Sequence, residues 1–216
     1  MSPPARASVV IVGGGVAGCS IAYHLTKLGV SDVVLLERRK LTCGTTWHAA
    51  GLVGQLRATR NLTELARYTA DLYHSLEAET GQATGFRQNG SISVAKTEAR
   101  FEELRRGASM GKTFGLQIDV LTAGEIRERW PLLAVDDLVG GIFLPKDGQT
   151  NPIDTTQALA KGAKLRGARI FENTPVTRIR VERGRAIGVE TADGFIAADT
   201  VVLCAGMWSH GMARDC

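Results

Sequence analysis

One pattern in the first forty residues constrains the fold more than any other. A β-branched run at 8–12 stops at three glycines, and residues 13–18 then read Gly-Gly-Gly-Val-Ala-Gly, which fits G-x-G-x-x-G. Apolar residues at helical spacing follow as far as Gly29, and a second apolar run at 33–36 ends at Glu37. This order of strand, glycine turn, helix and strand is typical of a parallel α/β sheet that binds a dinucleotide.

The chemistry of dinucleotide binding gives each of these residues a role. Gly13 permits the tight turn, Gly15 lets the backbone approach a pyrophosphate, and Gly18 allows the helix to pack closely on the strand. The N-terminal end of the helix offers free N–H groups and a positive dipole to the phosphates. Glu37, about 20 residues after the motif, is placed to accept hydrogen bonds from ribose hydroxyls. The motif alone does not separate FAD from NAD.

The remainder of the chain alternates between helical and strand patterns. Beyond a glycine- and threonine-rich loop at 40–60, the expected elements are helices at 61–80, 97–111, 122–129 and 152–166 and strands at 90–95 and 140–144. Short strands at 176–181, 186–191 and 195–198, joined at glycine turns, predict a β-meander. A separate buried strand at 201–203 then leads into Cys204-Ala205-Gly206.

Composition and charge exclude several classes of protein. Hydrophobic residues make up 44% of the chain, which is enough for a globular core, and the net charge of +4 is scattered rather than gathered into a nucleic-acid-binding stripe. Only seven residues precede the first apolar run, and no run is long enough to span a membrane. We therefore expect a cytoplasmic protein without nucleic-acid or membrane partners. Neither a metal-ligand pattern nor a Ser-His-Asp pattern is present, and Cys19, Cys43, Cys204 and Cys216 are expected to be reduced.

The β-meander that returns to the parallel sheet resembles FAD domains of the glutathione-reductase type. This resemblance favours FAD over NAD. It implies an FAD-binding domain formed by residues 1–85 and 150–216, with part of an α+β substrate domain inserted at 86–149.

The most specific segment reads Thr-Thr-Trp-His-Ala-Ala-Gly-Leu at 45–52. It resembles the flavin-attachment segment of the dimethylglycine and sarcosine dehydrogenases, in the D-amino-acid-oxidase-like superfamily. Shorter stretches resemble the same family, at 23–25, 79–82, 131–133, 147–148 and 205–208. Together with the 45–52 segment they extend the resemblance over about residues 8–209. The family's activity is oxidative N-demethylation of dimethylglycine or sarcosine by hydride transfer to FAD, within one-carbon metabolism. The resemblance also implies an electron-transfer flavoprotein as a partner and tetrahydrofolate bound beyond residue 216.

In that family a histidine of this segment carries FAD on a ring nitrogen, and His48 is the matching position. A neutral imidazole nitrogen is a competent nucleophile near neutral pH. The resemblance assigns no residue of this chain as catalytic acid or base, so the catalytic residues stay unknown. It implies FAD contacts from Gly13, Gly15, Val16, Ala17, Gly18, Glu37, Arg38, Gly44, Thr45, Thr46, Trp47, His48, Ala49, Ala50, Gly51, Leu52, Val176, Ala205, Gly206 and Trp208.

Alternatives remain open at this point. The chain ends before the family's late strand and glycine-rich turn, so we expect an incomplete fragment. His48 could pack against the flavin without a bond, Val176 could be a core residue, and Trp208 could be an ordinary aromatic of a surface cleft. The runner-up functions are an amino- or hydroxy-acid oxidase of the same superfamily and a non-catalytic FAD-binding remnant.

Overall fold

Two compact units make up the fold. The structure, a computed structural model, describes residues 2–214, so Cys216 lies outside the described residues. The first unit comprises Met1–Ala50, Leu76–Gly85 and Asn151–Cys216, and the second comprises Gly51–Ser75 and Phe86–Thr150. The predicted division of the chain into an FAD-binding domain and an inserted substrate domain stays a prediction. Within residues 2–214 no helix is long and apolar enough to cross a membrane.

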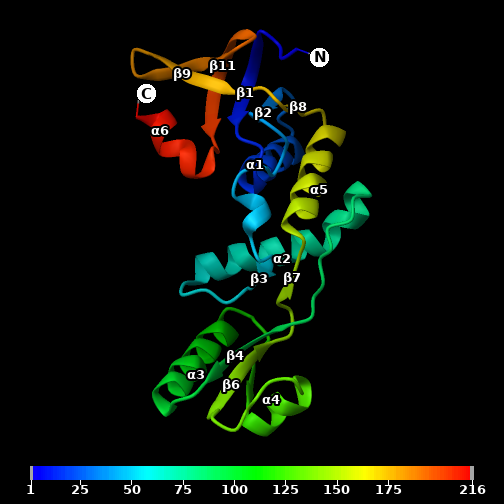
Figure 1. The fold of residues 1–216 in the computed structure, drawn as a ribbon, viewed down its shortest axis with the longest axis vertical. Helices are drawn as coiled ribbons and strands as arrows, with labels where there is room; N and C mark the ends of the chain where they lie inside the picture. Colours follow the sequence, from blue (N-terminus) through cyan, green and yellow to red (C-terminus); the bar gives the residue numbers. More distant parts are fainter. Residues whose placement is uncertain (1, 215–216) are drawn as a thin grey trace. The chain divides into compact units, whose positions relative to one another are not determined.

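A six-stranded mixed sheet forms the centre of the first unit (Figure 1). Its order is β8-β2-β1-β11-β10-β9, parallel from β8 to β11 and antiparallel from β11 to β9. The strands are β1 (Arg6–Val12), β2 (Val33–Leu36), β8 (Arg169–Phe171), β9 (Val176–Glu182), β10 (Arg185–Thr191) and β11 (Gly194–Leu203). The predicted α/β fold is confirmed, with β1 beside β2 and the meander crossing back to the parallel strands.

The end of the meander differs from the sequence prediction. Two strands were expected at 195–198 and 201–203, but β11 is one continuous strand of 10 residues. Its first half pairs antiparallel with β10, and residues 197–203 pair parallel with β1. No glycine or proline interrupts the chain between the two halves. Because nothing there breaks the strand, it serves both the meander and the parallel sheet.

Two helices, α1 (Val16–Lys27) and α5 (Pro152–Leu165), pack against each other in the first unit. The Tyr23 side chain is fully buried at their contact, where a Cβ on Gly162 would lie 2.8 Å from the tyrosine ring. Asn151 caps α5 by accepting hydrogen bonds from the N–H groups of Ile153 and Asp154. The short elements of this unit are η1 (Thr46–His48), η2 (Gly206–Trp208) and α6 (Ser209–Ala213).

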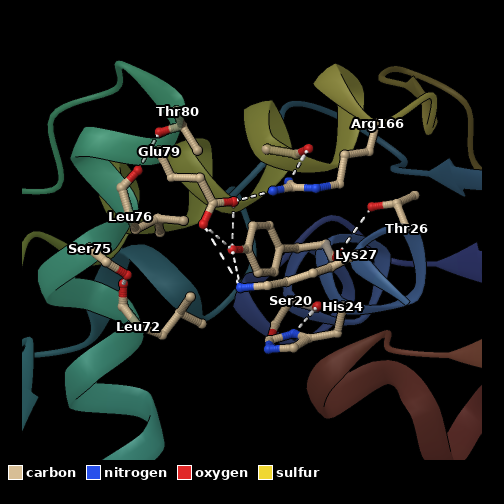
Figure 2. A network of polar contacts seen from close by, with 12 residues as sticks. Ser20, His24, Thr26, Lys27, Leu72, Ser75, Leu76, Glu79, Thr80 and Arg166 are labelled. Atoms are coloured by element: carbon tan, nitrogen blue, oxygen red, sulfur yellow. Dashed lines mark hydrogen bonds and ion pairs between the residues drawn. The ribbon is translucent and has the colours of Figure 1, made fainter. Parts of the chain in front are cut away.

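A carboxylate joins these two helices to the last turn of α2 (Arg60–Thr80). Both oxygens of Glu79 accept from the Tyr23 hydroxyl at 2.7 Å, and Glu79 forms an ion pair with Arg166 (Figure 2). The ammonium group of Lys27 lies 3.9 Å from Glu79 and donates to the Tyr23 hydroxyl. Burial raises the pKa of the Glu79 carboxyl, but the hydrogen bonds from Tyr23 and Arg166 and the neighbouring positive charges outweigh burial. The pKa therefore lies below its usual value of 4.5.

The second unit is built on a three-stranded antiparallel sheet, β4-β6-β5. Its elements are β3 (Leu52–Val53), β4 (Ser91–Ala95), α3 (Glu98–Thr113), β5 (Asp119–Leu121), α4 (Ala123–Arg129), β6 (Gly140–Leu144) and β7 (Gly148–Gln149). Helix α3 packs with one apolar cluster on this sheet and α4 with another. Asp147, which is 4% exposed, accepts from the Gln55 N–H and the Ser91 hydroxyl and so ties two loops together.

We predict that Glu79→Gln lowers the free energy of unfolding by about 1–2 kcal/mol at neutral pH, because a charged acceptor is lost from a partly exposed network. The lowered pKa of Glu79 means that this contribution is present above pH 4.5 and disappears as the pH falls through the folded-state value. Urea unfolding at pH 7 and at pH 3.5 measures both effects. Asp199→Asn is the control, since its ion pair with Arg6 is exposed. An equal effect of Glu79→Gln at the two pH values would contradict the assignment.

Candidate cofactor site

A cavity of about 520 Å³ opens at the carboxyl ends of β1, β2 and β11 in the first unit. This volume lies within the ~300–1,000 Å³ usual for cofactor sites. In an open parallel sheet the crevice at the strand ends is where nucleotides bind. Its wall comprises Val12, Gly13, Gly15, Val16, Ala17, Leu36, Glu37, Arg38, Cys43, Gly44, Thr45, Thr46, Pro175, Val176, Leu203, Cys204, Ala205, Gly206, Trp208, Ser209 and Met212.

The turn after β1 has no room for side chains. Gly13 has a φ of 113°, and a Cβ there would overlap the carbonyl oxygen of Cys204 on the neighbouring strand end. A Cβ on Gly18 would overlap the carbonyl oxygen of Gly13. The helix can therefore start directly at the strand end, with its first N–H groups at the cavity. These groups lack intrahelical partners, which suits an anionic ligand such as the pyrophosphate of a dinucleotide.

Part of the cap of α1 comes from a distant loop. Gly15 is the N-cap residue and offers no side-chain hydrogen bond, but the Thr46 hydroxyl accepts from the Val16 N–H at 3.0 Å. Thr46 is buried, with 8% of its surface exposed. The loop that contains the predicted flavin-attachment segment is thus fixed to the dinucleotide-binding helix by this hydrogen bond.

The Glu37 side chain is 7% exposed and lies in the cavity wall. One carboxylate oxygen accepts from the Gly14 N–H at 2.7 Å, and the other accepts from the Arg39 N–H at 3.0 Å. The Cys43 thiol also donates to this second oxygen, at 3.4 Å. Burial, together with the hydrogen bond and charge of Glu37, raises the pKa of Cys43, so the thiol keeps the proton that it donates. The carboxylate is therefore held rigidly, with remaining lone pairs available for hydroxyl donors.

Most of the residues predicted to bind FAD meet at this cavity. Those in its wall are Gly13, Gly15, Val16, Ala17, Glu37, Arg38, Gly44, Thr45, Thr46, Val176, Ala205, Gly206 and Trp208. Gly18 lies beneath the turn. Within residues 2–214, the wall ends in this loop at Thr46, and 47–50 are exposed beyond it. Gly51 and Leu52 belong to the second unit.

His48 is exposed two residues after the last wall residue of its loop, in the single turn of η1. Its ring centroid lies 3.7 Å from that of Trp47. Since successive Cα atoms are about 3.8 Å apart, the His48 backbone lies within about 8 Å of the Thr46 backbone. The imidazole is therefore accessible close to the end of the cavity wall.

Several wall residues were missed by sequence reasoning. They are Val12, Leu36, Cys43, Pro175, Leu203, Cys204, Ser209 and Met212. Most are direct neighbours of predicted residues, so the rule that strand ends face the crevice could have added Val12, Leu36 and Leu203. Met212 carries no such signal, because it reaches the cavity through α6, a helix that follows the predicted strands.

Comparisons with known proteins identify the family of the chain. The family model of FAD dependent oxidoreductases (DAO) matches residues 8–215. The chain is 45% identical to human mitochondrial sarcosine dehydrogenase over 98% of its length, and 39% identical to rat mitochondrial dimethylglycine dehydrogenase over 99%. It is also 40% identical, over 96% of its length, to the mouse mitochondrial pyruvate dehydrogenase phosphatase regulatory subunit. The chain spans only about a quarter of each relative, namely 24%, 25% and 24% of their lengths.

Solved structures show the same fold. L-proline dehydrogenase from P. horikoshii superimposes with a TM-score of 0.92 at 26% identity, over 98% of this chain and 57% of that one. Glycine oxidase from Bacillus cereus gives a TM-score of 0.82 at 31% identity, over 97% of this chain and 58% of that one. The expected resemblance to the sarcosine and dimethylglycine dehydrogenases is confirmed. The family model matches residues 8–215, and the glycine turn, the buried carboxylate and the cavity suit a dinucleotide. The chain therefore belongs to the DAO family of FAD-dependent oxidoreductases.

Proposed function

We propose that this chain forms the dinucleotide-binding part of an enzyme that demethylates an N-methylated glycine, with FAD joined to His48. The observation that carries the proposal is the loop at 43–48. It begins in the wall of the nucleotide cavity, is fixed to α1 through Thr46, and presents an exposed imidazole just beyond the wall. A dinucleotide held in the cavity would extend from Glu37 towards this end of the loop.

The residues of the chain would divide the binding of FAD among them. Glu37 would accept hydrogen bonds from ribose hydroxyls, while the first N–H groups of α1 would receive the pyrophosphate. His48 would hold the flavin end by a bond from a ring nitrogen to the 8α-methyl carbon. Such a bond would replace one C–H and one N–H by C–N; two protons would leave to solvent and two electrons to the electron acceptor of the enzyme. The attachment would prevent loss of the cofactor.

The substrate class is supported by the relatives. Two relatives are named for sarcosine and dimethylglycine, which are N-methylated glycines. A further relative, at 40% identity, is a formaldehyde-forming 4-methylaminobutanoate oxidase from Paenarthrobacter nicotinovorans. FAD, when bound, supplies the hydride acceptor. Loss of hydride from the N-methyl group leaves an iminium ion; water adds to it, and formaldehyde and the demethylated amine separate. An electron-transfer flavoprotein or oxygen would then take the two electrons, and tetrahydrofolate would accept the one-carbon unit in a further region.

A second candidate function is a regulatory protein that binds FAD without turnover. The specific observation in its favour is the 40% identity to a phosphatase regulatory subunit, close to the 45% identity to a dehydrogenase. Both candidates require the nucleotide cavity, so the cavity does not distinguish them.

Recognition of the ribose by Glu37 can be measured as FAD affinity. In a His48→Ala background, where FAD exchanges freely, Glu37→Gln should weaken FAD binding by about 1–3 kcal/mol, because charge-assisted hydrogen bonds to the ribose are lost. Glutamine retains an oxygen that can accept from the Gly14 N–H, so the turn should remain folded. Titration followed by flavin fluorescence measures the affinity, and Glu190→Gln, on the meander, is the control. Equal affinities of Glu37→Gln and the parent would refute the role of Glu37.

The covalent bond predicts a distinct result on denaturation. Acid-precipitated wild-type protein should retain yellow, fluorescent flavin in the pellet, whereas His48→Ala should release it to the supernatant. His74→Ala is the matched control, since His74 is also exposed but lies in the second unit. Complete release of flavin from the wild type would show that His48 makes no bond.

Substrate class is tested by anaerobic mixing. Sarcosine or dimethylglycine should bleach the flavin absorbance of the full-length protein, and formaldehyde should appear in equal amount, because the methyl carbon leaves as formaldehyde. Glycine, which lacks the N-methyl group, is the control. Tight FAD binding without bleaching by either N-methylated substrate would instead support the regulatory candidate.

A further inference from the structure

Two long side chains meet at the cavity wall. The guanidinium carbon of Arg38 lies 4.0 Å from the centroid of the Trp208 ring, and both residues belong to the cavity wall. Arg38 follows β2, and Trp208 lies in η2, which follows β11. Since β2 and β11 flank β1 on opposite sides, the pair joins segments that follow the two outer neighbours of β1.

The distance between the ends of β2 and β11 requires long side chains for a contact between them. Strands β2 and β11 are two strand spacings apart, about 9–10 Å. An arginine and a tryptophan are long enough to meet across this distance. Trp208 also lies near the loop at 43–46, because a Cβ added to Gly44 would lie 3.5 Å from its ring. Trp208 thus contacts Arg38 after β2 and lies close to the 43–46 loop.

The contact uses only part of each side chain. The guanidinium carbon makes the contact with the ring, and the group carries five N–H donors. Within residues 2–214, Arg38 has no carboxylate or carbonyl partner for these groups. The contact therefore holds a cation at the cavity wall and leaves its donors available.

We propose that Arg38 and Trp208 act as one coupled clasp that retains the bound dinucleotide, and that Trp208 is a positioning residue for the Arg38 guanidinium. This inference rests on the proposed FAD site but goes beyond two separate cofactor contacts. Without Trp208 the arginine loses its orientation, and without Arg38 the ring no longer bridges the two strand ends. Removing either half therefore weakens the same function, retention of the dinucleotide.

The test measures FAD release in the His48→Ala background of the full-length protein, where no covalent bond hides retention. Loaded protein is diluted, and flavin fluorescence reports the dissociation rate. Arg38→Met and Trp208→Leu should each accelerate release roughly 3- to 30-fold, the range expected for a cation–π contact. The double variant should be no faster than the faster single variant. Trp208→Phe, which keeps a ring face, should release FAD more slowly than Trp208→Leu.

Arg39→Met is the matched control, because it removes the same charge one residue further on, from a side chain outside the cavity wall. Both clasp residues are exposed, so melting temperatures of the FAD-free variants should equal that of the parent. Unchanged release in either single variant, or a double variant whose acceleration equals the product of the two, would overturn the clasp. A parent protein that binds no FAD would overturn the assignment of the cavity itself.

Discussion

The structure depends on a steric constraint at one turn, where three backbone segments meet without side chains between them. The chain leaves β1 at Gly13, against the carbonyl oxygen of Cys204, and the start of α1 returns at Gly18 to touch the carbonyl oxygen of Gly13. This close approach places the helix N-terminus at the strand ends. The cavity, the orientation of Glu37 and the loop held by Thr46 all follow from that placement.

Around this turn the polar groups support one another. Glu37 is fixed by the N–H groups of Gly14 and Arg39, and the Cys43 thiol adds a third donor. A carboxylate with its geometry set in advance loses little entropy when a ligand binds, which is the physical value of preorganisation. In the C-terminal half of α1, Tyr23 and Glu79 hold the helix to its neighbours, so both halves of this helix are anchored.

Local patterns predicted much of this arrangement. Within residues 8–37, residues close in sequence determine the turn, the helix and the two strands. Periodicity and glycine spacing were therefore sufficient to predict these elements. Thr46 was placed at the cofactor by resemblance, but its hydrogen bond to Val16 joins residues 30 positions apart, and no sequence period records such a contact. The continuity of β11 was missed for a related reason. Its two halves pair with different strands, and the change of partner leaves no turn signal.

The double pairing of β11 has a consequence for the order in which the chain assembles during synthesis. Ser8 bonds to Asp32, 24 positions away, so one edge of β1 can pair early, but the ion pair between Arg6 and Asp199 joins positions 193 residues apart. At a translation rate of about 5–20 residues per second, the second edge of β1 waits roughly 10–40 s for its partner. An unpaired strand edge is a template for pairing with other chains. During this interval the second edge of β1 is open to pairing with other chains, and a chaperone that covers it would limit aggregation.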